Sequence, residues 1–215
     1  MNYDANILIL ALLSGASGSV QAASPGDLWY IHVGAARYAT DEAAAVRVMG
    51  SPVAGSGVRL DPRYTAAVEL GRFIAPNLVV SLSAGVPVKQ SVRGSGTIQP
   101  LGRLGRITYG PAAATVHWHP WATGAVRPYL GGGISYLHVF ASGDAAVRDF
   151  GASDTVGPLA QGGLEVPVGH SLGLFADVKK AWLRTTATGS LGGAPVRARI
   201  RLDPLVLHSG LAVRF

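Results

Sequence analysis

Hydrophobic and polar residues alternate along most of the chain. In residues 78–86 every even position is apolar, and the odd positions from Ser81 onward are mostly small or polar. In residues 172–182 the even positions are mainly apolar, while Asp177 and Lys179 occupy odd positions. A repeat of two residues is typical of a β-strand whose two faces meet different surroundings.

The same reading predicts eight strands joined by connections of alternating length. The predicted strands are residues 28–39, 64–73, 78–89, 106–119, 127–140, 155–168, 172–183 and 202–215. Short turns are predicted at 74–77, 120–126 and 169–171, and long loops at 40–63, 90–105, 141–154 and 184–201. Short turns at one end and long loops at the other are typical of an outer-membrane barrel. In residues 106–119 the alternation does not show which face of the strand points outward, because the two faces are nearly equally apolar.

Composition favours a barrel in lipid over a soluble one. The chain is 48% hydrophobic and only 14% charged, with a mean hydropathy of +0.31. A soluble eight-stranded barrel or a sandwich, the alternative fold, would show polar outer faces. We therefore predict an all-β fold, an eight-stranded antiparallel transmembrane β-barrel with short periplasmic turns and longer extracellular loops.

The N-terminus predicts export. An apolar segment at residues 7–13 is followed by small residues and by Val20-Gln21-Ala22, which suits signal-peptidase cleavage after Ala22. We expect a signal peptide at residues 1–22 and the barrel at residues 23–215, and hence a protein of the cell outer membrane.

Charge and cysteine content exclude several kinds of site. With no cysteine, the chain has no disulfide, thiolate metal site or cysteine nucleophile. Its 18 basic residues are dispersed, and Arg197, Arg199 and Arg201 on alternate positions come nearest to a cluster. This dispersion argues against nucleic acid. It suits outer-membrane lipids, including anionic lipopolysaccharide, because guanidinium groups bind phosphates.

Several segments resemble the OmpW family of small outer-membrane proteins. Residues 127–136, Arg-Pro-Tyr-Leu-Gly-Gly-Gly-Ile-Ser-Tyr, are similar to its RPYxGxGxxY strand, and Leu202-Asp203-Pro204 with the ending Val213-Arg214-Phe215 is similar to its last strand. Further similar pieces follow in the family's order over nearly all of residues 26–215. The resemblance implies an eight-stranded barrel that passes small hydrophobic molecules. It also implies that Phe215 is an assembly signal read by the barrel-assembly machinery.

Strand parity predicts which polar side chains face the lumen. The candidates are Glu69, Ser81, Ser83, Gln161, Glu165, Asp177, Lys179 and Arg214. Because buried charges must be paired, we interpret the charged members as a structural ion-pair plug. A polar transport path is the alternative.

Two motifs suggest other chemistry. Residues 169–173, Gly-His-Ser-Leu-Gly, match the nucleophile elbow of α/β-hydrolases, and Asp203 and His208 follow in the order of a triad. The elbow needs a helix after it, whereas residues 172–183 alternate as a strand. His117 and His119 share one strand face and could both bind a metal, but no third ligand is near in sequence. We therefore expect no enzyme, no cofactor and no metal.

The sequence thus predicts a narrow channel or pore for small hydrophobic molecules. The alternative is a non-conducting structural or adhesion barrel whose external loops bind a partner.

Overall fold

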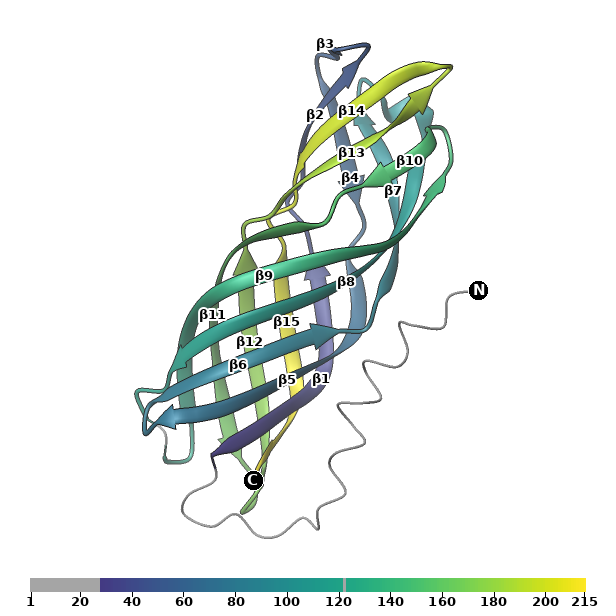
Figure 1. Cartoon of the computed structure of the whole chain (residues 1–215). Helices are drawn as coiled ribbons and strands as arrows, with labels where there is room; N and C mark the ends of the chain where they lie inside the picture. Colours follow the sequence, from purple (N-terminus) through teal and green to yellow (C-terminus); the bar gives the residue numbers. More distant parts are fainter. Residues whose placement is uncertain (1–27, 122) are drawn as a thin grey trace.

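The computed structural model describes residues 28–121 and 123–215, which form a β-structure with one 3-10 turn at Gln99–Leu101 (Figure 1). The predicted signal peptide at residues 1–22 lies outside these residues. In the described ranges no helix has the length and apolar character needed to cross a bilayer. The strands are β1 (Trp29–Ala39), β2 (Ala43–Val48), β3 (Ser51–Pro52), β4 (Ser56–Leu60), β5 (Arg63–Ala75), β6 (Leu78–Gly85), β7 (Val88–Gly96), β8 (Arg103–Trp118), β9 (Arg127–Asp144), β10 (Arg148–Ala152), β11 (Thr155–Pro167), β12 (Leu172–Ala181), β13 (Arg184–Leu191), β14 (Ala194–Arg201) and β15 (Leu205–Arg214).

The main sheet closes into an eight-stranded antiparallel barrel. Going round the wall, the order is β1, β5, β6 with β7, β8, β9, β11, β12 and β15, and β15 pairs with β1 again. Closure gives every strand in this part of the wall two neighbours, which is the condition for a sheet in lipid. The predicted fold is confirmed.

The external end differs from the prediction. Most of the segments expected as long loops continue the barrel strands outward, as β2 to β4, β7, β10, β13 and β14. A second sheet, in the order β10-β13-β14-β2-β3, forms one side of this extension. Its inner face packs on the extended part of the main sheet through a buried apolar core that includes Val46, Phe150 and Ile200. The extension is therefore ordered by its own hydrophobic core.

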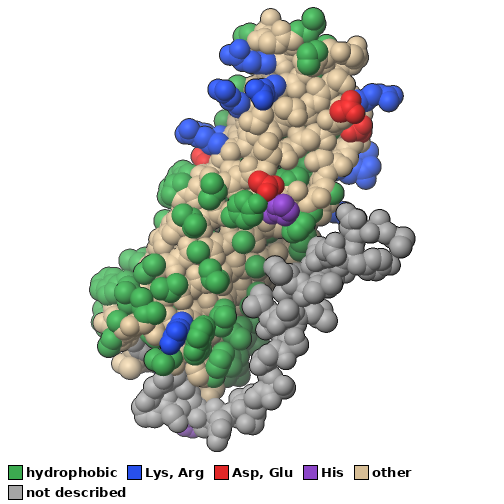
Figure 2. All heavy atoms as spheres, viewed as in Figure 1, with side chains coloured by type: hydrophobic (Ala, Val, Ile, Leu, Met, Phe, Trp, Pro, Cys, Tyr) green, Lys and Arg blue, Asp and Glu red, His purple; other side chains and the backbone are tan. Residues whose placement is uncertain are grey.

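Exposed apolar side chains cover the other half of the barrel: they gather on the face seen in Figure 2, and each of β1, β5, β6, β8, β9, β11, β12 and β15 carries some. These side chains are hereafter the apolar band. Outward positions such as Leu82, Leu130, Ile134 and Leu211 are half exposed or more, which would be unfavourable in water over so large a surface. The structure also resolves the faces of β8: Thr115 and His117 point inward and are buried, whereas Val116 and Trp118 point outward.

A polar cluster marks the outer edge of this band. Asp154, in the connection between β10 and β11, accepts hydrogen bonds from Tyr136 Oη (2.5 Å) and from the Val139 N–H (2.8 Å), and lies 2.7 Å from His138 Nδ1. The hydrogen bond from Tyr136 lowers the pKa of Asp154 to about 2. An exposed carboxylate is costly in hydrocarbon, so this cluster lies at the polar border of the apolar band.

The facing of β6 gives a direct test. Leu82 lies midway along β6 and is 62% exposed, so Leu82→Arg should lower the free energy of unfolding in lipid by about 2–4 kcal/mol. Leu172→Arg, at the inner rim, is the depth control and should cost less than about 1 kcal/mol. Equal losses, measured by reversible unfolding in lipid vesicles, would contradict this facing.

Candidate functional site

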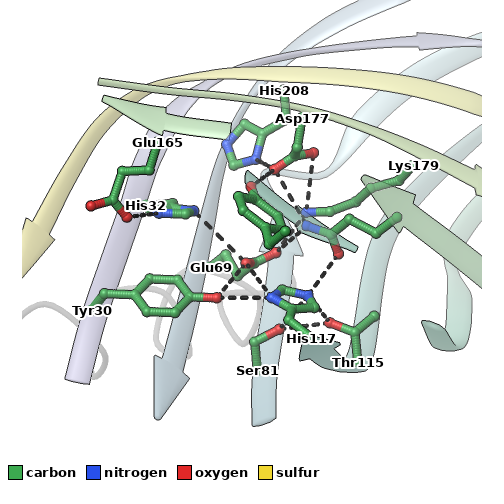
Figure 3. A network of polar contacts seen from close by, with 12 residues as sticks. Tyr30, His32, Glu69, Ser81, Thr115, His117, Glu165, Asp177, Lys179 and His208 are labelled. Atoms are coloured by element: carbon green, nitrogen blue, oxygen red, sulfur yellow. Dashed lines mark hydrogen bonds and ion pairs between the residues drawn. The ribbon is translucent and has the colours of Figure 1, made fainter. Parts of the chain in front are cut away.

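The inner half of the lumen is filled by polar side chains. Of the lumen candidates taken from the sequence, Glu69, Ser81, Gln161, Glu165, Asp177 and Lys179 are buried, and Ser83 and Arg214 are partly buried. All except Ser83 take part in one connected set of polar contacts, hereafter the plug. Figure 3 shows its central part.

Glu69 is at the centre of the plug and has no exposed surface. Its Oε2 accepts hydrogen bonds from Lys179 Nζ at 2.8 Å and from Gln161 Nε2 at 3.2 Å. Its Oε1 accepts one from Tyr30 Oη at 3.0 Å. A buried carboxylate is stable only with such partners, so β1, β5, β11 and β12 are tied together through one side chain.

Asp177 forms the second branch of the plug. Tyr129 Oη donates to Asp177 Oδ2 at 3.1 Å, and Lys179 Nζ lies 3.8 Å from Oδ1. His208 Nδ1 lies 3.6 Å from Oδ2. Lys179 thus lies between two carboxylates, Glu69 and Asp177.

His117 links the plug to β6 and β8. Its Nδ1 is 3.1 Å from Tyr30 Oη, and its Nε2 is 2.8 Å from Thr115 Oγ1 and 3.1 Å from Gln161 Oε1. Ser81 Oγ lies 2.6 Å from Thr115 Oγ1. Both ring nitrogens therefore have polar neighbours inside the lumen.

A second ion pair lies nearer the inner rim. Arg214 donates from Nε and Nη2 to the two oxygens of Glu165, at 2.8 and 3.0 Å, in the fork geometry that suits a carboxylate. Arg127 Nη1 is 3.4 Å from the same carboxylate. On its other side Glu165 lies 3.5 Å from His32 Nε2, and the His32 ring stacks on Phe175 with centroids 4.1 Å apart.

The formal charges of these groups balance. Three carboxylates, on Glu69, Glu165 and Asp177, face three cations, on Lys179, Arg127 and Arg214. With neutral histidines this part of the lumen carries no net charge. It can therefore lie inside a membrane without an unpaired ion.

Glycines on neighbouring strands make room for the two plug tyrosines. Tyr30 lies directly opposite Gly71, where a Cβ atom would come within 2.2 Å of the Tyr30 ring. Tyr129 lies opposite Gly163, where a Cβ would be 2.6 Å from that ring. Each ring lies flat on the wall, so that its hydroxyl reaches a carboxylate.

Several members of the plug were missed by sequence reasoning: Tyr30, His32, Thr115, Arg127, Tyr129 and His208. Tyr30 and His32 share inward parity with Ala36, and His208 shares it with Val206 and Ala212. The alternation along β1 and β15 therefore already indicates that these side chains face the lumen. What the sequence did not show is that these rings reach the carboxylates of distant strands.

Above the plug the lumen becomes apolar. A cavity of about 70 Å³ is lined by side chains without charge, among them Ile107, Leu137, Phe150, Leu159 and Leu183. A smaller space of about 30 Å³ continues it toward the external tip and shares Phe150 with it. A third, of about 40 Å³, continues it inward, shares Leu159 with it and has Lys179 and His208 in its lining. Together they form an apolar column that ends on the plug.

The innermost of these spaces lies beside a break in the barrel wall. The break is on the side of β8, which changes partner from β6 at Ala112↔Ala84 to β7 at Tyr109↔Val88. On the side of β5 the Val86 N–H still donates to the Ala66 carbonyl at 2.9 Å, one residue beyond the pair Ala67↔Gly85. The broken strand contains Pro87, which has no N–H to donate. The side chains around the break are small: Ala67, Ser83, Ala84, Gly85, Ala112 and Ala113.

The hydrolase-like residues lie far apart. Ser171 is in the turn at the inner end, where its carbonyl accepts the Arg214 N–H at 2.9 Å. Arg214 is the last residue of β15, whereas Asp203 lies just before its first residue. Because β15 has ten residues, Asp203 is roughly 30 Å from Ser171. His208 is buried beside Asp177. The three do not form a triad.

His119 and Phe215 have defined places. His119 is buried between the rings of Phe73 and Tyr129, at 5.3 and 5.1 Å. Within residues 28–121 and 123–215 no group of three His, Cys, Asp or Glu side chains could hold a metal ion. Phe215 is half exposed, and its N–H donates to the Trp29 carbonyl at 3.0 Å. Its role in assembly stays a prediction.

A closed barrel with an apolar outer band, short turns at one end and a charge-balanced lumen is an outer-membrane β-barrel protein. The comparisons give the family: the OmpW family model matches residues 25–215, and the chain belongs to the OmpW family.

Relatives and solved structures agree with this assignment. The chain is 30% identical to the dibenzothiophene metabolism operon protein PahQ of Pseudomonas aeruginosa, over 87% of this chain and 88% of the relative. It is also 30% identical to the outer membrane protein AlkL of Ectopseudomonas oleovorans, over 83% and 77%. The crystal structure of OprG from Pseudomonas aeruginosa superposes with a TM-score of 0.83 at 19% identity, covering 90% of this chain and 98% of that one. The solid-state NMR structure of AlkL gives a TM-score of 0.73 at 28% identity, covering 93% and 96%.

Proposed function

We propose that this protein admits small apolar molecules from the medium into the outer membrane, without catalysis. The observation that carries the proposal is the column of apolar spaces, uncharged except where its innermost space meets Lys179, that ends on the plug and beside the wall break. An apolar solute is favoured in such a column and disfavoured in the plug, because entry into the plug would separate polar groups from their partners.

In this proposal the solute leaves the barrel sideways, through the wall and into the lipid. A solute held above the plug has small side chains on the wall side, around Gly85 and Ala113, and lipid beyond them. The chemistry in the name of PahQ supports the substrate class, because dibenzothiophene is an apolar aromatic compound.

Transport also requires side chains to move. An apolar cavity that binds benzene has a volume of about 150 Å³, roughly twice the 70 Å³ of the central space. We infer that the structure is the closed form, and that Phe150 and Leu159, each shared by two adjoining spaces, turn aside as a solute passes.

The test is uptake through a lipopolysaccharide-containing outer membrane. Cells that make this protein should take up the apolar fluorophore N-phenylnaphthylamine faster than cells without it. Ala113→Phe fills the space of about 40 Å³ beside the break and should reduce the added rate at least about fivefold, because the added ring leaves no room there for a solute.

Ala114→Phe is the matched control. Ala114 is the next residue of β8 and faces outward, so the same added ring should leave uptake unchanged. Equal rates with and without the wild-type protein would contradict the channel and favour the structural or adhesion barrel. Equal loss in both variants would contradict the lateral exit alone.

A further inference from the structure

Five arginines gather on the outer face of the second sheet. Arg197, Arg199 and Arg201 alternate along β14, so they project from the same side, and all are exposed. In the register of the sheet, Arg197 is directly opposite Arg47 of β2, and Arg201 is directly opposite Arg184 of β13. These five residues are hereafter the arginine ladder. Figure 2 shows basic side chains along the external half of the molecule, above the apolar band.

The chain itself does little to neutralise this ladder. Arg201 Nε is 3.2 Å from Asp203 Oδ2. Across the residues that the structure describes, Arg47, Arg197 and Arg199 have no carboxylate within ion-pair distance. Their cross-strand neighbours on this face are Ala45, Thr186 and Thr188. Like charges directly opposite one another destabilise a sheet, so the arrangement is unfavourable unless an anion lies on it.

The position of the arginine ladder indicates which kind of anion would bind to it. The lowest pair of the arginine ladder, Arg184 and Arg201, lies just beyond Trp182, an exposed aromatic residue at the outer end of the apolar band. Alternate residues of a strand are about 7 Å apart, so the ladder rises roughly 13 Å from there to Arg197. Its far end opens into a groove of about 680 Å³ lined by Arg47, Arg197 and Arg199. The ladder thus continues the lipid-facing side of the barrel outward.

We propose that the arginine ladder binds the phosphorylated sugars of a neighbouring glycolipid of the lipopolysaccharide type. Guanidinium groups take phosphate through two parallel N–H donors, and a vertical series of them matches a head group that bears anionic groups at several heights. The ligand belongs to the lipid leaflet because the ladder rises directly from the apolar band. This site is separate from the apolar column, which lies on the inner side of the same sheet.

The experiment measures glycolipid binding to the purified barrel in zwitterionic nanodiscs. Phosphorylated lipopolysaccharide should raise the unfolding temperature of the wild type, and the dephosphorylated form should raise it much less. In the triple variant Arg47→Gln, Arg197→Gln, Arg199→Gln the apparent affinity should fall at least about tenfold, since three charge-assisted contacts are lost. Without glycolipid the triple variant should be at least as stable as the wild type, because repulsion is relieved.

The opposite sheet offers a charge-matched control. Arg59, Arg93 and Arg103 of β4, β7 and β8 are also directly opposite one another, and Arg93 is 3.9 Å from Asp61. They form one row across three strands, so they lack the series along a strand that would meet anionic groups at several heights. Replacing these three by glutamine removes the same charge and should leave binding within about twofold of the wild type, because surface charge away from a contact acts only through a screened field. Equal loss in both triple variants would mean that net charge alone attracts the glycolipid, and would overturn the proposal. Equal protection by inorganic phosphate at the same concentration would overturn the lipid as the source of the anion.

Discussion

Replacing Lys179 by leucine is expected to lower the free energy of unfolding by about 3–5 kcal/mol, the usual cost of breaking a buried ion pair from one side. Lys179 Nζ contacts Glu69 at 2.8 Å and Asp177 at 3.8 Å, and Glu69 has no access to solvent. Without the ammonium group, two buried carboxylates share no cation. Reversible unfolding in lipid vesicles at neutral pH measures the loss.

The double variant Glu69→Gln, Lys179→Leu is the control for this prediction. A glutamine at position 69 carries no charge and keeps one acceptor oxygen, which can serve either Tyr30 or Gln161. Because removing both members of a buried pair is often nearly neutral, the double variant should regain the part of the stability that was lost through Glu69, while Asp177 keeps only Tyr129 and His208 as neighbours. If it is as unstable as Lys179→Leu, the loss comes from packing and the plug is not held together by charge.

The sequence predicts well which side of the barrel wall most residues face. Within the band, lipid outside and a polar lumen inside impose a strict alternation, and this placed Leu82 outward and Lys179 inward. Strand β8 escaped the rule because Ala112, Ala113 and Ala114 are small and apolar on both faces. Its facing follows from register with β6, in which Ser81 lies opposite Thr115.

The contacts of the plug could not be predicted. Glu69 and Lys179 are separated by 110 positions in the chain. They meet because β5 and β12 lie on opposite sides of β1 and β15 and their side chains cross the lumen. Parity tells which side a residue faces, but partner choice depends on strand tilt and closure.

The sequence predicts loops where the external strands lie, and this has a physical reason. Outside the lipid, only a thin core has to be buried, and turn glycines such as Gly50, Gly55 and Gly192 interrupt the alternation. A signal was present in β14, where Arg197 and Arg199 alternate with the buried Ala198 and Ile200. Without the register of the sheet, these arginines indicate only that basic charge is present here.

Opening the plug is expected to convert the closed inner end into an aqueous pore. The double variant Glu69→Ala, Lys179→Ala removes equal and opposite charges, so the net charge of the plug is unchanged, and Asp177 keeps Tyr129 and His208 as neighbours. It replaces two long side chains, each less than a tenth exposed, by methyl groups. The space left is lined by Gln161, Tyr30 and Asp177, polar groups that water can satisfy.

Single-channel recording in planar bilayers measures the effect. The double variant should carry at least about tenfold more ion current than the wild type, because continuous water through a lumen replaces a filled one. Ser83→Ala, which shortens a side chain above the plug, is the control and should conduct like the wild type. Uptake of N-phenylnaphthylamine should change little in the Ala–Ala variant, since the proposed apolar route leaves the barrel above Glu69. A wild type that already conducts as well as this variant would mean that the plug does not seal the lumen, and the proposed route would then run through the barrel's inner end.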